Sequence, residues 1–127
     1  MTANEYQRLA LRTEKTPAFC QGDGERTDHQ QSRLLHGAIG ICTEAGELQD
    51  MIKKSLIYGK PMDVINIVEE IGDLYWYCAL VLDSVGYTPE QAMEKNINKL
   101  RARFGDRFTE YRALNRDLDL ERKELEK

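Results

Sequence analysis

Two pairs of acidic residues have the spacing of a carboxylate site built on neighbouring helices. Glu44 and Glu47 stand three positions apart, and so do Glu70 and Asp73. Residues at this spacing share one face of an α-helix. Four carboxylates brought together need a cation, because like charges in contact repel by about 4 kcal/mol at an effective dielectric constant near 20. A ligand set of oxygen atoms alone suits Mg²⁺ or Mn²⁺ rather than zinc.

Two other interpretations of the acidic pairs remain. Either pair taken alone could be a solvated acidic face, since carboxylates commonly flank the apolar stripe of a helix. A carboxylate-rich bundle could also hold two iron ions, but such a site uses Glu-x-x-His on two helices. The residues three positions before His29 and His36 are Arg26 and Arg33, so the spacing argues against di-iron.

A cationic face follows further along the chain. Asn96, Lys99 and Arg103 stand at i, i+3 and i+7, which places them on one side of a helix. Lysine and arginine bind phosphate oxygens, and arginine can do so with two parallel hydrogen bonds. Lys54 is aligned with Glu47 and could serve similarly. Apolar residues of the same helix can anchor it without these cations, so we expect the loss of Arg103 to change stability by no more than about 0.5 kcal/mol. The alternative to a phosphate contact is the solvent face of an amphipathic helix.

Aromatic residues and glycines accompany the acids. His36 precedes the first acidic pair by two to three turns, and Trp76 and Tyr77 stand three and four positions after Asp73. Each of these rings is expected either to pack in the core or to contact a nucleobase. Gly37 and Gly40 lie on the stripe of the first pair, where they serve close helix packing or clearance for a ligand.

Hydrophobic periodicity predicts an all-α fold. Apolar residues recur at helical spacing, and no segment alternates long enough to suggest a strand. The second helix is expected to begin at Asp28 as its N-cap, with Gln31 completing a capping box, after a loop over 16–27. A short connection at 58–62 favours an antiparallel pair of long helices as the centre of a helical bundle. The expected helices cover 4–15, 28–59, 63–86, 89–105 and 109–126.

The composition is that of one globular domain in a reducing compartment. The chain has 127 residues, 41% hydrophobic and 31% charged, which predicts a single domain over 1–127 with its core over about 4–111 and a peripheral C-terminal helix. A net charge of -4 argues against a nucleic-acid partner. The longest apolar run, 74–82, is too short to span a bilayer, and 1–12 lacks the apolar core of a signal peptide. The three cysteines form no C-x-x-C pair, so we expect a cytoplasmic location, with Cys42 and Cys78 as small core residues.

Taken together, these residues resemble the MazG-like, all-α nucleoside triphosphate pyrophosphohydrolases. The acidic pairs stand in EAGE at 44–47 and EIGD at 70–73, like the E-x-x-E…E-x-x-D signature of that family. The resemblance covers about 4–111. Beyond the acids it includes EYQ at 5–7, LHGAIGI at 35–41, YGKP at 58–61 and NINKLRARF at 96–104.

The resemblance implies a divalent-metal hydrolase that splits nucleoside triphosphates into a monophosphate and pyrophosphate. Water would attack a phosphorus of the triphosphate, and Glu47 or Glu70 is expected to orient it. Some relatives carry an acid directly before the first signature glutamate, where this chain has Thr43. The implied ligands of Mg²⁺, or of Mn²⁺, are Glu44, Glu47, Glu70 and Asp73. The implied contacts to phosphate or nucleotide are Asn96, Lys99 and Arg103.

The resemblance also implies a homodimer or a dimer of dimers. The run 74–82 is apolar almost all round, which independently predicts burial on more than one side of its helix. Two other functions stay open at this point. One is a specialised relative acting on dUTP or phosphoribosyl-ATP, and the other is a non-catalytic helical interaction module whose acids form a solvated face.

Overall fold

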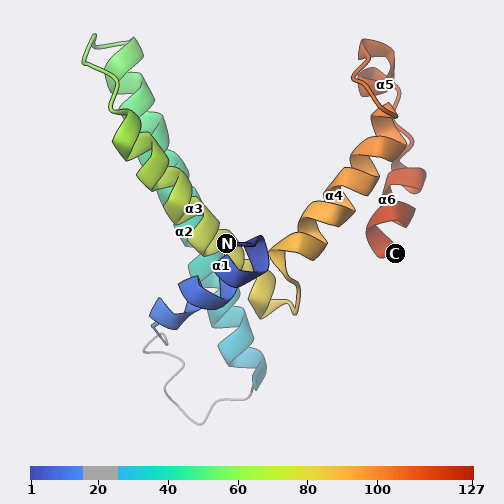
Figure 1. Ribbon diagram of the computed structural model, residues 1–127, viewed down its shortest axis with the longest axis horizontal. Helices are drawn as coiled ribbons and strands as arrows, with labels where there is room; N and C mark the ends of the chain where they lie inside the picture. The colour runs from blue at the N-terminus through green and yellow to red at the C-terminus, as the bar shows by residue number, and fades with distance from the viewer. Residues whose placement is uncertain (16–25) are drawn as a thin grey trace. The chain divides into compact units, whose positions relative to one another are not determined.

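The computed structural model describes residues 1–15 and 26–127, and this part of the chain contains helices and no strands (Figure 1). The all-α prediction is therefore confirmed. No helix in the described ranges is both long and apolar enough to cross a membrane. Cys20 and most of the loop predicted over 16–27 lie outside these ranges. The elements are α1 Ala3–Ala10, the 3-10 helix η1 Leu11–Thr13, α2 Arg26–Leu56, α3 Val64–Ser84, α4 Pro89–Phe104, α5 Glu110–Leu114 and α6 Leu118–Glu126.

Contacts divide the chain into two compact units, Met1–Thr88 and Pro89–Lys127. The first contains α1, η1, α2 and α3, and the second contains α4, α5 and α6. The single domain with a peripheral C-terminal helix stays a prediction.

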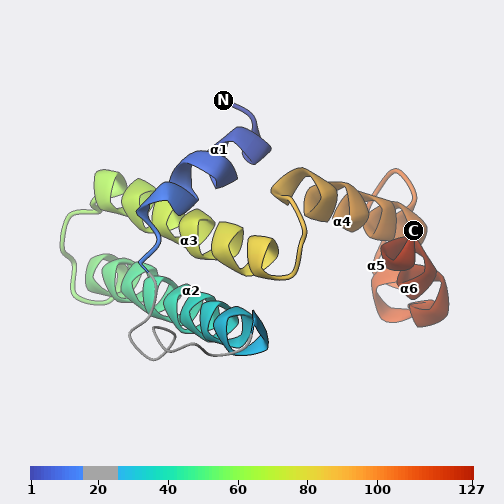
Figure 2. The same cartoon turned by 90° about the horizontal axis from the view of Figure 1, so that it is seen from below.

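An antiparallel hairpin of α2 and α3 forms the centre of the first unit, as the sequence predicts (Figures 1 and 2). α2 ends at Leu56, and Gly59 follows with φ +65°, a backbone conformation that favours glycine. Asp63 then caps α3, because its side chain accepts a hydrogen bond of 3.1 Å from the backbone N–H of Asn66.

Two buried glycines let the hairpin helices approach closely. A Cβ atom at Gly37 would overlap the Val81 side chain, and one at Gly40 would overlap the ring of Tyr77. Both glycines therefore serve helix packing, which is one of the two roles that the sequence left open.

The first helix covers the side of α3 that faces away from α2 (Figure 2). The Tyr6 hydroxyl donates to the Gly72 carbonyl at 3.1 Å. The buried Gln7 amide donates to the carbonyls of Ala79 at 3.2 Å and Tyr87 at 3.1 Å. These hydrogen bonds connect α1 to the backbone of α3 and of the turn that follows it.

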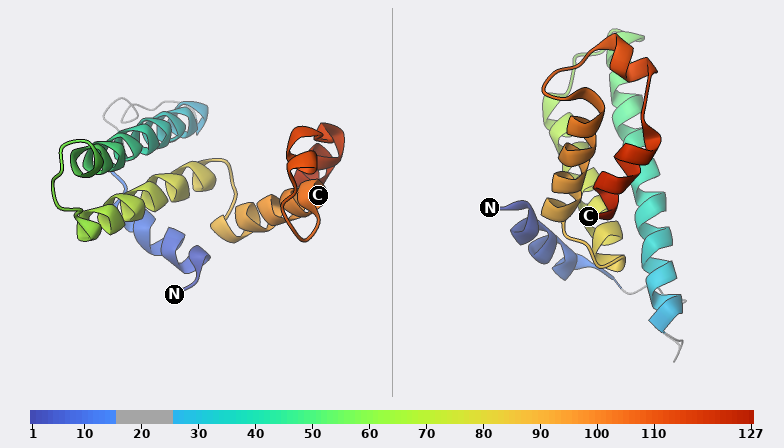
Figure 3. Two further views of the ribbon diagram at one scale, coloured as in Figure 1. Left: turned by 90° about the horizontal axis from the view of Figure 1, so that it is seen from above. Right: turned by 90° about the vertical axis from the view of Figure 1, so that its right-hand side faces the viewer.

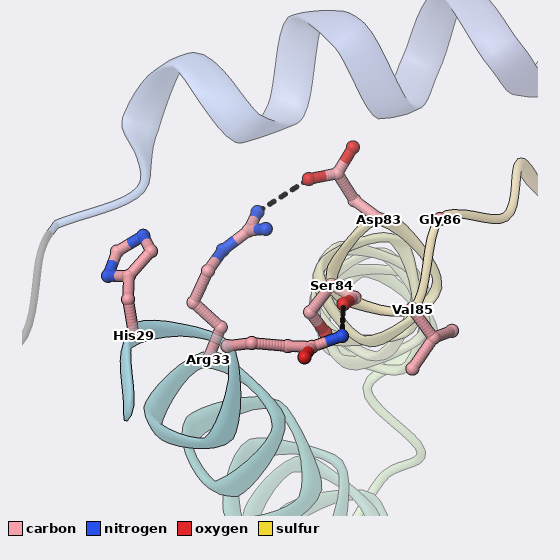
Figure 4. A pocket seen from close by; sticks show the side chains of 7 residues that line it. His29, Arg33, Asp83, Ser84, Val85 and Gly86 are labelled. Carbon is pink, nitrogen blue, oxygen red and sulfur yellow. Dashed lines mark hydrogen bonds and ion pairs between the residues drawn. The ribbon is translucent and has the colours of Figure 1, made fainter. Parts of the chain in front are cut away.

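An arginine clamp closes the far end of the hairpin. Arg33 on α2 donates two hydrogen bonds to Glu14, at 2.7 and 2.9 Å, and one of 2.7 Å to Asp83 on α3. Figure 4 shows Arg33 reaching Asp83 beside His29 and Gly86, in a hollow of about 520 Å³. Because Arg33 stands eleven positions before Glu44, this hollow lies about 16 Å from the first acidic pair along α2.

The second unit packs α6 against α4 (Figure 3). Pro89 occupies the first position of α4, and Gly105 follows its end with φ +66°. The single helix predicted over 109–126 is wrong. The helix is interrupted after α5. The Asn115 side-chain amide donates to the Tyr111 carbonyl at 2.8 Å, and the Asp117 carboxylate caps α6 by accepting a hydrogen bond of 2.9 Å from the backbone N–H of Leu120.

Two further sequence predictions need correction. α2 begins at Arg26, so Asp28 lies inside the helix rather than at its N-cap; aspartate is common both at the cap and in the first turn. Cys42 and Cys78 are exposed rather than buried, since no element within 1–15 and 26–127 covers them. Of the described hydrophobic residues, only Ala79 and Leu80 are buried.

The glycine contacts predict opposite effects of one substitution at two sites of α2. Gly40→Ala should lower the free energy of unfolding by about 1–3 kcal/mol, because the new methyl group overlaps a ring that cannot move freely. Gly46→Ala should raise it by roughly 0.5–1 kcal/mol, because no atom lies within 4 Å of the added carbon. Urea unfolding of both variants checks this, and equal effects would contradict the packing role of Gly40.

Candidate metal centre

Three carboxylates from the two long helices converge midway along the hairpin. Glu44 and Glu47 on α2 and Glu70 on α3 each present an oxygen atom, and these atoms all lie within 4.8 Å of one another. Glu70 is 6% exposed, Glu44 is half-buried and Glu47 is exposed. The cluster therefore has one buried wall and an opening to solvent.

The charges of this cluster are not offset by the protein. Burial, the charge of Glu47 and a hydrogen bond with Glu70 raise the pKa of the Glu44 carboxyl, in that order of importance. None of the ion pairs among the described residues joins a lysine or arginine to these three carboxylates. A set of carboxylate oxygens without a protein cation fits a hard divalent ion such as Mg²⁺ or Mn²⁺.

Asp73 lies apart from the three glutamates. Its carboxylate does not belong to the group within 4.8 Å, although its charge contributes to the raised pKa of Glu44. It lines a neighbouring hollow together with Glu44. The structure thus brings three of the four predicted ligands together and places the fourth beside them.

Asn66 holds the buried member of the cluster. Its side-chain amide donates to Glu70 at 3.3 Å and also contacts the Met51 sulfur. Asn66 is not among the site residues predicted from the sequence. Its position four residues before Glu70, on the same face of α3, was the available signal.

One hollow, of about 390 Å³, opens beside Glu47 and Glu70. Lys54 lines it but is paired with Asp50 at 2.6 Å, and Lys53 pairs with the same carboxylate at 2.5 Å. Hydrogen bonds from these two lysines lower the pKa of Asp50 to about 2. Thr43 also lines this hollow, and its hydroxyl donates to the Ile39 carbonyl of its own helix at 3.0 Å.

A second hollow, of about 400 Å³, lies on the Glu44 side and has aromatic walls. The rings of His36, Trp76 and Tyr77 meet edge to face, with centroids 5.1–6.1 Å apart. Trp76 is held from outside, because its indole N–H donates to the Ala10 carbonyl at 3.0 Å and to the Thr13 hydroxyl at 2.9 Å. Lys15 lines the same hollow, and the sequence analysis missed it because nothing in its local pattern points there.

Tyr77 connects this aromatic hollow to the acids. Burial, and then the charges of Glu44 and Asp73, raise the pKa of its hydroxyl. Flat apolar faces beside a cluster of carboxylates that could hold a cation suit a ligand that carries both an aromatic ring and phosphate groups.

The predicted cationic face lies on α4. Asn96 is exposed and Lys99 is half-buried. Arg103 is not a solvent-exposed cation, which corrects the expectation that its loss would leave stability almost unchanged. Its guanidinium donates to both oxygens of Glu121, at 2.8 and 2.5 Å, and its side chain is 18% exposed.

Comparison with known proteins supports the resemblance seen in the sequence. Residues 36–108 match the family described as MazG nucleotide pyrophosphohydrolase domain. No curated protein and no solved structure matches the chain. The matched region is more than half of the chain and contains all four signature acids, His36, Lys99 and Arg103. The chain belongs to the MazG nucleotide pyrophosphohydrolase domain family.

Proposed function

We propose that this protein hydrolyses nucleoside triphosphates to a nucleoside monophosphate and pyrophosphate in the presence of Mg²⁺, with Mn²⁺ as a substitute. Membership in the family indicates a nucleotide pyrophosphohydrolase in general terms. The observation that carries the finer proposal is the convergence of Glu44, Glu47 and Glu70 beside an aromatic hollow. One end of that arrangement suits a metal–phosphate group and the other suits a base.

In this proposal the acids hold the cation and the attacking water. Glu44, Glu47, Glu70 and Asp73 bind the ion, which when bound neutralises phosphate charge. Glu47 or Glu70 orients the water, whose oxygen forms a bond to phosphorus while the α–β anhydride bond breaks and pyrophosphate leaves. Positioning and charge stabilisation supply most of the rate enhancement in such reactions.

Substrate recognition is assigned to two sets of residues. Lys54, Asn96, Lys99 and Arg103 contact the phosphates, and His36 contacts the base within the aromatic hollow. The indole N–H of Trp76 is already hydrogen-bonded, so Trp76 would contribute to base binding only through the face of its ring.

The base contact predicts a selective effect of His36→Ala. This substitution should raise KM for nucleotides without changing KM for inorganic tripolyphosphate, which has no base. Equal effects on both KM values would contradict a base contact.

We propose that the molecule works as a homodimer or a dimer of dimers in the cytoplasm, with neither nucleic acid nor membrane as a partner. Ile65 and Val68 share one face of α3 and are 84% and 66% exposed, while Leu35 and Ile39 on α2 are also exposed. α1 covers α3 only further along, from Gly72 onwards. Large apolar side chains exposed on both helices of the hairpin favour an interface with a second copy. A monomeric mass by light scattering at micromolar concentration would contradict the proposal.

The acid cluster predicts that metal binding and catalysis are lost together. Glu70→Gln should abolish pyrophosphate release from a nucleotide panel that includes dUTP and phosphoribosyl-ATP. It should also abolish the stabilisation by Mg²⁺ or Mn²⁺, which for the wild type is about 2.7 kcal/mol at a hundred times Kd. Glu69→Gln is the matched control, because Glu69 is exposed on the same helix one position earlier. Wild-type metal response in Glu70→Gln would refute the site.

The cationic face of α4 predicts a loss of activity when Lys99 or Arg103 is removed. Lys99→Ala and Arg103→Ala should lower kcat/KM by roughly thirtyfold to a thousandfold, since each loses a charge-assisted contact to the phosphates. Arg101→Ala is the control, because Arg101 is exposed and lies on another face of the helix. Arg103→Ala should also lower stability, because the Glu121 carboxylate loses a bidentate donor. Wild-type turnover by Lys99→Ala would contradict the phosphate role.

A further inference from the structure

Two guanidinium groups of the second unit converge on one buried carboxylate. Arg103 donates to both oxygens of Glu121, at 2.8 and 2.5 Å. Arg116, in the segment between α5 and α6, donates to the same two oxygens at 3.2 and 2.8 Å. Glu121 is only 4% exposed. These hydrogen bonds lower the pKa of its carboxyl to about 2, so the carboxylate is ionised throughout the neutral range.

This arrangement has the chemistry of an oxyanion site that is already filled. Arginine presents its donors in a planar fork that binds two oxygens of a carboxylate or a phosphate equally well. Two such forks carry two positive charges, whereas Glu121 supplies one negative charge. A phosphate group with more charge and more acceptor oxygens would satisfy both arginines better than the carboxylate does.

The element that supplies Glu121 is a short helix with two exposed leucines. α6 has nine residues, a length at which a helix is marginal on its own. Leu118 and Leu120 are exposed. Besides the hydrogen bonds from Arg103, the attachment to α4 includes a hydrogen bond of 2.8 Å from the Lys95 ammonium to the Leu125 carbonyl. Contacts of this polar kind can be exchanged for contacts to a charged ligand.

We propose that Arg103 and Arg116 form a binding site for the pyrophosphate portion of a nucleotide, and that Glu121 occupies this site as an intramolecular competitor in the free protein. The proposal rests on the assignment of Arg103 to substrate phosphates made above, and it adds Arg116 as a second ligand. A tethered competitor acts at an effective concentration on the order of millimolar. It therefore sets the nucleotide concentration at which α6 releases Arg103, and it keeps the site closed to weaker anions.

The test measures binding of inorganic pyrophosphate to the full-length protein by calorimetry, without divalent metal and at constant ionic strength. Glu121→Gln should bind pyrophosphate about tenfold more tightly than the wild type, because the competitor no longer populates the closed state. Glu126→Gln is the matched control, since Glu126 lies on the same helix in an exposed pair with Arg122 at 2.5 Å. Adding Arg116→Ala to Glu121→Gln should reverse the gain. Equal or weaker binding by a folded Glu121→Gln variant overturns the proposal.

A second measurement needs no variant and covers the case in which Glu121→Gln does not fold. Saturating pyrophosphate should speed amide hydrogen exchange across Leu118–Glu126 in the wild type, because α6 gives up its attachment. Unchanged or slower exchange there, or no binding at millimolar pyrophosphate, overturns the proposal. Neither experiment depends on turnover. If the protein binds pyrophosphate in this way but hydrolyses no nucleotide, only the proposed function is refuted. If it hydrolyses nucleotides but Glu121→Gln leaves pyrophosphate binding unchanged, only this inference is refuted.

Discussion

The close approach of α2 and α3 at Gly40 is the constraint on which the acidic site depends. Tyr77 lies where a side chain at position 40 would have to be, so the two helix backbones can come together there. Gly40 stands one turn before Glu44, and Tyr77 stands one turn after Asp73. The contact therefore fixes the separation of the two helices at the height where their carboxylates meet. A larger residue would move the helices apart and would separate Glu70 from the glutamates of α2.

The same contact explains why the site has two different sides. The Tyr77 ring that fills the space above Gly40 also meets His36 and Trp76, so an aromatic wall begins where the acids end. Helix α1 contributes from outside by fixing the indole of Trp76. A hollow that is acidic at one end and aromatic at the other follows from this one packing arrangement. The carboxylates of α2 and α3 repel one another and so oppose the close approach of the two helices. A bound cation would therefore stabilise both the site and the hairpin.

Charge satisfaction differs sharply between the two units. In the first, Glu44, Glu47 and Glu70 converge, and no lysine or arginine of the described residues forms an ion pair with them, so their mutual repulsion favours a bound cation. In the second, Glu121 receives hydrogen bonds from two arginines and keeps its charge. In the two proposals above, the glutamates of the first unit and the arginines of the second each bind a ligand of opposite charge. The acids are open to a metal ion, whereas the arginines are occupied by a carboxylate of the same chain.

The sequence by itself determined the two long helices, α4 and the identity of the acids, but it did not predict the break between α5 and α6. Helices and their ends depend on residues a few positions apart, so they can be predicted from short stretches of sequence. Examples are the hydrophobic periodicity, the cap at Asp63 and the glycines at 59 and 105. The i,i+3 spacing of the acidic pairs likewise fixed which carboxylates share a face.

The tertiary structure decided what depends on distant partners. It showed that Gly40 serves packing against Tyr77, that Asp73 lies beside the cluster of three glutamates, and that Lys15 lines the aromatic hollow. It also showed that Arg103 is engaged by Glu121, eighteen residues away. No local pattern encodes such contacts, because they arise only when separate helices pack and their side chains compete for the same partners.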